Sequence, residues 1–335
     1  YLYGSFRAVC AENIDIFGYG VIDGSREVRT DESRLLLNDY PAPLPADREN
    51  ILRRLKQRHV LDGILRFYRC RHIRVEGPTL RDAATFAVIP AGCEDVTLEN
   101  LKTIGMWRYN ADGIDLFNCR DVRIRNCFLR NYDDCVVIKG IVGWDTTDNA
   151  DILVEGCVVW CDWGRNLELG AETNAPAFWN ILFRNCDCIH GSTAFLDIQH
   201  HNRADIGQVT FEDIRVEYTK HQLPDVFQND MDAPYPTDTP VRHPLLFCLP
   251  IYRSGLFAED GLNGRIHDIT FRNIRILTDA PEVPVPESAF LGLDAEHTVE
   301  RICIAGVTCN GKRLATREEL RLHINEFVRD VTILP

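Results

Sequence analysis

Residues 110–140 begin with Asn-Ala-Asp-Gly-Ile-Asp-Leu and end with Asn-Tyr-Asp-Asp-Cys-Val-Val-Ile-Lys-Gly, and the rest of the chain is organised around this segment. Asp133 follows Asp112 by 21 positions. The apolar strand pattern at 114–117 returns at 136–138, directly after the second group of acids. One complete structural repeat therefore separates the acids, and we expect its two ends to lie side by side.

A short apolar-x-apolar pattern recurs along the whole chain. Between residues 73 and 209 its copies follow one another at steps of 23–30 residues. Two steps, 14 to 73 and 209 to 269, are about twice as long, and we expect each to contain one further coil with a degraded pattern. The copies are Ile14/Ile16, Ile73/Val75, Val96/Leu98, Val122/Ile124, Ile152/Val154, Ile181/Phe183, Val209/Phe211, Ile269/Phe271, Ile302/Ile304 and Val331/Ile333.

A turn-forming residue follows these strands at a fixed offset. Gly, Asn and Asp accept left-handed backbone, so every coil is expected to bend at the same corner. Stacked Asn side chains can also hydrogen-bond along such a corner. The residues are Gly77, Asn100, Asn126, Gly156, Asn185, Asp213, Asn273 and Gly306.

Two further strand patterns accompany each copy. One precedes it, as at 64–67, 86–89, 114–117, 136–138, 167–169, 195–198 and 245–249, and a shorter one follows, as at 127–129 and 158–160. Three short strands per turn predict an all-β protein, a single-stranded parallel β-helix of about ten coils. We expect one domain over residues 1–335. Leucine-rich repeats are the competitor, but the chain lacks their regular Leu frame and constant period.

Three segments depart from the repeat. Residues 32–61 are polar and Pro-rich and then Arg-rich, which predicts an insertion with a helical run. Residues 225–243 are rich in Pro and Asp and predict a long loop. Residues 316–329 predict a short helix that caps the open carboxy-terminal end.

The bulk composition limits the partners. A net charge of −13 and a pI near 5.2 argue against nucleic acid or an anionic membrane as partner. No apolar run approaches the roughly 18 residues of a membrane span. The composition does not indicate an oligomeric state.

Thirteen Cys are present, an odd number without the spacing of a zinc site, and we expect no metal or cofactor. Cys70, Cys93 and Cys119 recur at one repeat offset, which predicts reduced thiols stacked in the core. Unpaired thiols favour a cytoplasmic location. Because the chain starts at Tyr1 without an initiator Met, a processed amino end and a secreted or periplasmic location stay open.

The acids Asp112, Asp133 and Asp134 are expected within one inter-strand spacing, because Ile114 matches Val136 in register. Carboxylates so close repel one another unless one is protonated, which produces an acid beside bases. Inverting glycoside hydrolysis needs such a set: an acid for the leaving oxygen and a carboxylate that activates water. A calcium site or a simple turn cluster is the alternative.

The pattern Asn-x-Asp-Gly-Ile-Asp, followed about twenty residues later by Asp-Asp-Cys-x-x-Ile-Lys, resembles the polygalacturonase family of glycoside hydrolases and its relative, the dextranase family. The opening at 14–24 is also similar to an early coil of that clan. The resemblance covers roughly residues 10–275 and implies a right-handed parallel β-helix that inverts configuration. It implies Asp133 as general acid, with Asp112 and Asp134 holding and deprotonating water.

Two departures from the polygalacturonase pattern bear on the substrate. The Gly-His-Gly of that family is here Gly164-Arg165-Asn166, and its Arg-Ile-Lys, whose cations grip a uronate carboxylate, is Asp197-Ile198-Gln199. An acid in place of the Arg would repel a carboxylated sugar. We therefore expect an α-linked neutral glycan, nearer to the dextranase side of the clan.

Further candidates for contact with the substrate surround the acids. Residues that alternate with apolar positions on one sheet are expected to face the cleft, and aromatic rings suit stacking on sugars. The candidates are Trp107, Asp115, Lys139, Arg165, Glu168, Glu172, Asp197, Gln199 and His200, of which Arg165 either holds a catalytic carboxylate or binds substrate.

Three functions stay open at this point. The first is the inverting hydrolase of neutral glycans. The second is activity on a uronate polymer, as a polygalacturonase or as a lyase, which needs a cationic base. The third is a β-helix that binds glycans without catalysis.

Overall fold

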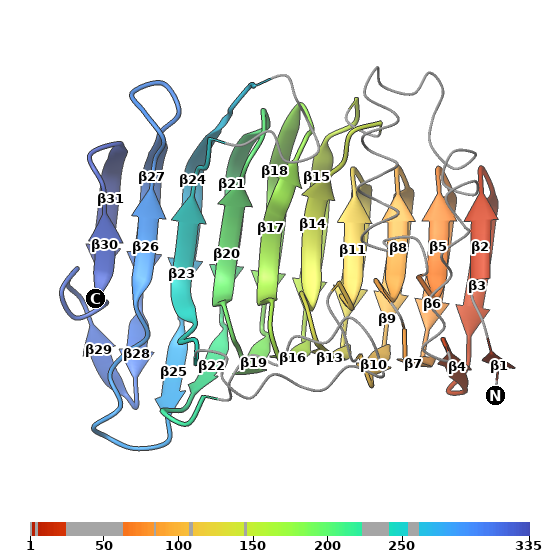
Figure 1. Ribbon diagram of the computed structural model, residues 1–335, viewed down its shortest axis with the longest axis horizontal. Coiled ribbons are helices and arrows are strands. Elements are labelled where there is room, and N and C mark those ends of the chain that lie inside the picture. The colour runs from red at the N-terminus through yellow and green to blue at the C-terminus, as the bar shows by residue number, and fades with distance from the viewer. Residues whose placement is uncertain are drawn as a thin grey trace.

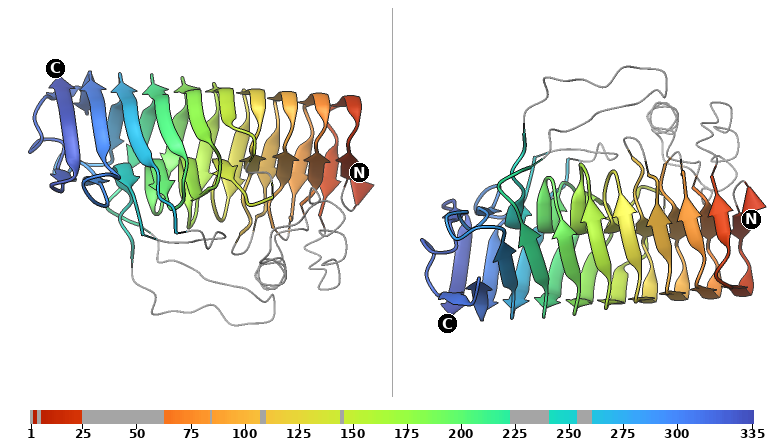
Figure 2. Two further views of the ribbon diagram at one scale, coloured as in Figure 1. Left: turned by 90° about the horizontal axis from the view of Figure 1, so that it is seen from above. Right: turned by 90° about the horizontal axis from the view of Figure 1, so that it is seen from below.

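The computed structural model describes residues 2–3, 6–24, 63–83, 85–106, 110–143, 146–222, 241–253 and 261–335. Over these ranges the chain forms strands and turns only, arranged as a right-handed parallel β-helix of three sheets (Figure 1). The coils stack in sequence order, so the first and last described strands lie at opposite ends (Figure 2). The described residues contain no helix that would cross a membrane.

Sheet I contains ten strands and carries the acids discussed below. Each strand pairs in parallel with its copy one coil away. The pairing of β14 with β17 is also parallel, but its register shifts between Ile138 and Gly140. Its strands are β2 (Phe6–Val9), β5 (Leu65–Tyr68), β8 (Val88–Ala91), β11 (Ile114–Phe117), β14 (Val136–Gly140), β17 (Arg165–Thr173), β20 (Ala194–His200), β23 (Leu245–Pro250), β26 (Ser288–Leu291) and β30 (Leu322–Ile324).

Sheet II also has ten strands and contains the apolar-x-apolar repeat. Successive copies of that repeat pair in register, from Ile14 with Ile73 to Ile302 with Val331. Its strands are β3 (Glu12–Phe17), β6 (Arg71–Glu76), β9 (Glu94–Glu99), β12 (Arg120–Arg125), β15 (Asn149–Glu155), β18 (Ala177–Arg184), β21 (Asp205–Glu212), β24 (Arg265–Arg272), β27 (Val299–Ala305) and β31 (Val328–Leu334).

Sheet III has eleven short strands, of which the last two form an antiparallel pair at the carboxy-terminal end. They are β1 (Leu2–Tyr3), β4 (Val21–Asp23), β7 (Thr79–Arg81), β10 (Lys102–Ile104), β13 (Phe128–Asn131), β16 (Val158–Cys161), β19 (Asp187–His190), β22 (Arg215–Tyr218), β25 (Arg275–Thr278), β28 (Val307–Cys309) and β29 (Lys312–Leu314).

The interior is a continuous column of apolar side chains. Phe183, Phe211 and Phe271 stack along it, with ring centroids 4.8 and 5.3 Å apart. Stacking of like residues in successive coils lets each coil bury its apolar face against two neighbours. All thirteen Cys are free thiols and ten of them are buried, which confirms the prediction of reduced thiols in the core.

The corner is present at all eight positions where it was predicted. The residues from Gly77 to Gly306 at this offset all have positive φ, between 52° and 94°. Asn273 donates to Asp213 across the corner at 3.0 Å, as the prediction of stacked side chains requires. A second left-handed position, directly before each repeat, was not predicted, because His72, Gln208 and Arg301 are among its occupants.

Two predictions about irregular segments are wrong. The long steps contain no extra coil, because β3 pairs directly with β6 and β21 pairs directly with β24. Residues 316–329 form turns, the strand β30 and the start of β31 instead of a capping helix, because Leu322–Ile324 pairs with β26. The insertion expected at 32–61 lies outside the described residues, as does all of the loop at 225–243 except 241–243.

Candidate active site

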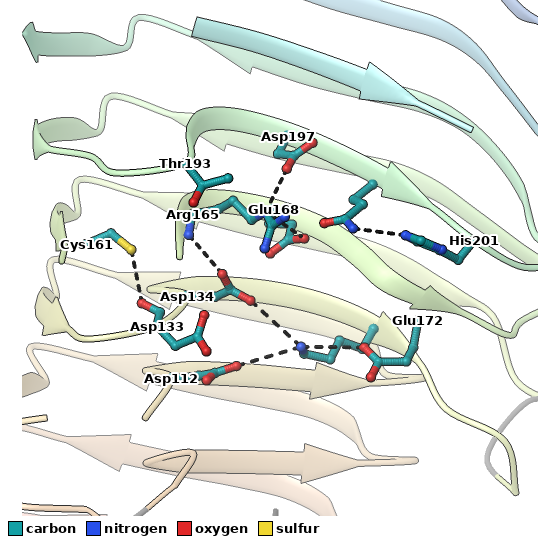
Figure 3. A network of polar contacts seen from close by, with 12 residues as sticks. Asp112, Asp133, Asp134, Cys161, Arg165, Glu168, Glu172, Thr193, Asp197 and His201 are labelled. Atoms are coloured by element: carbon teal, nitrogen blue, oxygen red, sulfur yellow. Dashed lines mark hydrogen bonds and ion pairs between the residues drawn. The ribbon is translucent and has the colours of Figure 1, made fainter. Parts of the chain in front are cut away.

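The three predicted acids lie on neighbouring turns that lead into sheet I (Figure 3). Asp112 precedes β11, and Asp133 and Asp134 precede β14. Ile114 pairs with Val136 as expected, and the Gly113 amide donates to the Asp134 carbonyl at 2.8 Å. The parallel ladder thus holds both turns at one end of the sheet. The acids are recessed, with only 1, 4 and 5% of Asp112, Asp133 and Asp134 exposed.

Gly164, one coil further on, lies against two of the acids. A Cβ at this position would fall 2.4 Å from Oδ1 of Asp133 and 2.4 Å from Oδ1 of Asp134. These two oxygens are therefore at most twice that distance apart. Backbone amides hold each carboxyl in place, because Arg165 N donates to Asp134 at 2.8 Å and Asn110 N donates to Asp133 at 3.0 Å.

Lys139 lies among four carboxyl groups, of which Figure 3 labels Asp112, Asp134 and Glu172. Its Nζ is 3.7 Å from Asp112, 3.7 Å from Asp115, 3.9 Å from Asp134 and 3.6 Å from Glu172. Asp112 and Asp134 therefore lie within 4 Å of the same cation, although they come from different coils. The side chain of Lys139 is only 8% exposed, so it is committed to these acids instead of to solvent.

Arg165 pairs with the remaining acids on the floor of sheet I. Its Nε is 3.0 Å from Asp197 and 3.7 Å from Glu168. Glu168 and Asp197 are in register on β17 and β20, and both are almost completely buried. Within the described part of the chain, one oxygen of Asp197 and both oxygens of Glu168 are buried and accept no hydrogen bond of standard geometry.

The cluster contains seven buried carboxyl groups and two cations: Asp112, Asp115, Asp133, Asp134, Glu168, Glu172 and Asp197, with Lys139 and Arg165. Six of the seven have a side-chain nitrogen of Lys139 or Arg165 within 4.0 Å. Of the seven carboxyl groups, Asp133 alone has no such ion pair with any residue that the structure describes. Asp133 thus has no direct cationic partner among these residues, which favours its protonated form.

The pKa shifts support a protonated Asp133, but they do not single it out among the buried acids. Burial, followed by the charge of Asp134, raises the pKa of Asp133 to about 7. Burial and the neighbouring Asp115 raise the pKa of Asp112 well above its usual range. Burial raises the pKa of Asp197 to about 6, with Arg165 acting against it. Burial lowers the pKa of Lys139, but the surrounding carboxylates outweigh it and leave that pKa raised, so this lysine is charged.

The remaining predicted contacts are Gln199, His200 and Trp107. Gln199 lies on the outer side of β20 and contacts His201, with 2.9 Å between its Nε2 and the ring Nε2. His200 does not join the cluster: it is completely buried, and its Nδ1 lies 2.7 Å from Thr173 Oγ1. Burial lowers the pKa of His200 to about 3, so it is a neutral, structural histidine. Trp107 lies outside the described residues.

Some residues of the site were not predicted as such. The Asn110 amide and the close approach of Gly164 depend on how turns from different coils meet, which residue spacing does not reveal. Within the described ranges, no group of three or more His, Cys, Asp or Glu is arranged to hold a metal ion. Lys139 Nζ is the cation at the centre of this acid cluster.

Comparisons with known proteins were made for the sequence and for the fold. Residues 48–226 match the glycosyl hydrolases family 28. A segment of 74 residues is 30% identical to a probable polygalacturonase of Vitis vinifera, which is 22% of this chain and 15% of that protein. The chain thus spans less than a sixth of the curated relative that it matches.

Three solved structures share the fold. An exopolygalacturonase of Thermotoga maritima has a TM-score of 0.57 and 19% identity, over 98% of this chain and 71% of its own. A family 28 exopolygalacturonase of Yersinia enterocolitica has a TM-score of 0.52 and 16% identity, over 96% and 60%. Dex49A from Penicillium minioluteum has a TM-score of 0.61 and 11% identity, over 99% and 52%.

The fold and the recessed carboxyl cluster define a parallel β-helix protein of the glycoside hydrolase type. The family match covers more than half of the chain and includes all three predicted catalytic acids. This protein belongs to the glycosyl hydrolases family 28.

Proposed function

We propose that the protein hydrolyses an α-glycosidic bond in a neutral glycan with inversion of configuration. Asp133 is the general acid, and Asp112 and Asp134 hold and deprotonate the attacking water. The observation that carries this proposal is the charge pairing: of seven buried carboxyl groups, only Asp133 lacks a cation within 4.0 Å among the described residues. A pKa of about 7 leaves its proton in place at mildly acidic pH.

The reaction follows from these roles. Asp133 gives its proton to the glycosidic oxygen as the bond from that oxygen to the anomeric carbon breaks. Water adds to the anomeric carbon from the opposite face and gives its proton to Asp134 or Asp112. The product therefore carries the opposite anomeric configuration. Exchange of one proton with solvent, off the base and onto Asp133, returns the site to its starting state.

The charge balance of the floor supports a neutral sugar. Seven carboxyl groups face only two cations, and Arg165 is already paired with Asp197 and Glu168. A uronate carboxylate would add another negative charge to this recess, at a cost that a hydroxyl group avoids.

Hydrolysis of a uronate polymer is the second candidate. It is favoured by the family and by the probable polygalacturonase and exopolygalacturonase relatives. In this case Arg165 would have to exchange its contact with Asp197, now 3.0 Å, for the substrate carboxylate. The two candidates therefore differ in whether the Arg165–Asp197 pair stays intact when substrate binds.

The test is a substrate panel with the configuration of the product as readout. Nitrophenyl α-glycosides of neutral sugars, α-glucans and polygalacturonate are incubated with the protein, and NMR follows the first anomer released. We expect turnover of a neutral α-glycoside with inversion. Turnover of polygalacturonate alone would favour the second candidate, and ultraviolet absorbance from an unsaturated product would indicate a lyase. Binding without turnover on every substrate would contradict catalysis.

A further inference from the structure

Lys139 was expected to contact substrate, but its surroundings indicate another role. It lies on the outer side of β14, and its aliphatic chain carries Nζ to 5.3 Å from the centre of the Phe86 ring. The side chain is 8% exposed, and the four nearest carboxyl groups surround Nζ. The charge of Lys139 is thus balanced by acids of the protein itself before any substrate binds.

The backbone around Lys139 holds it in this position. Its carbonyl accepts hydrogen bonds from Asn118 N at 3.1 Å and from Asn149 Nδ2 at 3.0 Å. The register shift that follows Ile138 pairs Gly140 with Thr173 instead of continuing the regular ladder. A Cβ on Gly140 would fall 2.6 Å from the Asn174 amide nitrogen, so only glycine permits this approach. The shift brings Glu172 within reach of Nζ.

All four distances from Nζ lie between 3.6 and 3.9 Å. They are too long for direct N–H···O hydrogen bonds, so Lys139 acts on the four groups through its charge. Groups facing it are Asp115 from β11, Asp112 and Asp134 from the turns, and Glu172 and Glu168 from β17, with Asp133 and Arg165 beyond them. One cation thus serves both groups of the water-activating pair.

We propose that Lys139 is a positioning residue whose charge favours the ionised forms of Asp112 and Asp134, so that the one proton needed for catalysis resides on Asp133. This inference rests on the proposed function, because it assigns the division of protons among the same acids. Without the cation, the carboxyl groups around Nζ would share one or more protons to relieve their repulsion. The base would then carry a proton that it must lose before it can accept one from water.

The test is the pH dependence of kcat/KM in Lys139→Met, with Lys139→Arg as the matched control. An opposite charge within about 4–6 Å lowers a carboxyl pKa by about 1–3 units. We therefore expect the acidic limb of the Lys139→Met profile to move to higher pH by about 1–3 units. Lys139→Arg keeps the charge, so its acidic limb should remain near that of the wild type even if turnover falls.

Glu172→Gln provides an independent test with the opposite sign. Removing one of the four negative charges reduces the repulsion among the remaining carboxylates around Lys139. Their pKa values should therefore fall, and the acidic limb should move to lower pH. This variant keeps the buried lysine, and it decides the question if Lys139→Met does not fold. A structural role for Lys139 would change stability or turnover and leave both limbs where they are, and that result would overturn the inference.

A measurement without substrate separates this inference from the proposed function. Infrared absorption of protonated carboxyl groups at pH 7 should be stronger in Lys139→Met than in the wild type and in Lys139→Arg. If Asp133→Asn retains full activity, the proposed function fails, while the infrared comparison still decides the role of Lys139. An unchanged infrared band together with unshifted limbs would contradict the inference on its own.

Discussion

Gly164 lies so close to Asp133 that a methyl group on its Cα would fall 2.4 Å from Oδ1 of that carboxyl group. The same methyl group would fall 2.4 Å from Oδ1 of Asp134. A carbon and an oxygen from residues far apart in the chain do not pack so closely, so a side chain at this position must displace both acids. The absence of a side chain at residue 164 is thus a condition for the geometry of the site.

Gly164→Ala should reduce kcat/KM by about 100-fold or more, because a displacement of about 1 Å in a catalytic group costs that much. Gly20→Ala is the matched control, since a Cβ there meets no atom within 4 Å. The comparison uses steady-state kinetics on the best substrate, with circular dichroism to check the fold. Full activity of Gly164→Ala would show that the positions of Asp133 and Asp134 do not control turnover.

Arg165→Met should destabilise the protein, because it leaves Asp197 and Glu168 buried without their cation. Breaking one side of a buried ion pair costs about 3–5 kcal/mol. Asp197→Asn in the same chain removes one of the two uncompensated charges, so the double variant should lose less stability than the sum of the single variants. Urea unfolding of the four proteins measures this coupling, and additive losses would contradict the pairing seen at 3.0 Å.

The raised pKa of Asp133 links stability to pH. Its folded-state value of about 7 exceeds the ordinary 3.8, so between these values the folded protein holds a proton that the unfolded chain releases. The contribution of Asp133 to stability therefore falls as the pH rises from about 4 to about 7 and is lost above that range.

Asp133→Asn removes this penalty and should raise the melting temperature at pH 8. Below about pH 4 the wild-type carboxyl is protonated in both states, so the two proteins should melt at similar temperatures. Calorimetry at several pH values measures the difference. A melting temperature of Asp133→Asn that stays equal to or below that of the wild type at pH 8 would show that Asp133 is not held protonated.

The thiols offer a test of the core. Cys10 is exposed and Cys303 and Cys309 are half-buried, whereas the other ten thiols are buried. Burial and thiol–thiol hydrogen bonds raise the pKa of buried members such as Cys93 and Cys157, so thiolate is scarce at neutral pH. A thiol reagent should react quickly with one group in the native protein and with all thirteen after unfolding. Rapid modification of Cys93 or Cys157 in the folded state would contradict the stacked core.

Much of the fold could be predicted because the repeat is visible in residue types that have one structural use. Val and Ile at alternating positions mark the buried strand, and Asn or Gly marks the left-handed corner. The two long steps were misinterpreted because spacing alone does not distinguish an extra coil from an insertion between paired strands. The prediction of a helix at 316–329 is wrong because the pairing of β30 with β26 outweighs local helical propensity.

The site, like the fold, could be predicted from the sequence only in part. The register of Ile114 with Val136 follows from the repeat, so the meeting of Asp112 with Asp134 was predictable. The role of Lys139 was not, because its position depends on a register shift and on the approach of Gly140 to Asn174. Alternation places a side chain on the outer face of a sheet, but it does not reveal which groups surround it there.

The most direct measurement of the central claim is the dependence of Asp133→Asn on the leaving group. Wild type and variant are compared on two glycosides of the same sugar. The leaving group is dinitrophenol in one and a second sugar in the other. A general acid is needed mainly by the poor leaving group. We predict that kcat/KM falls by about 100-fold or more when the leaving group is a sugar and by far less when it is dinitrophenol. Equal losses on both substrates, or no loss on either, would contradict the assignment of Asp133 as the acid.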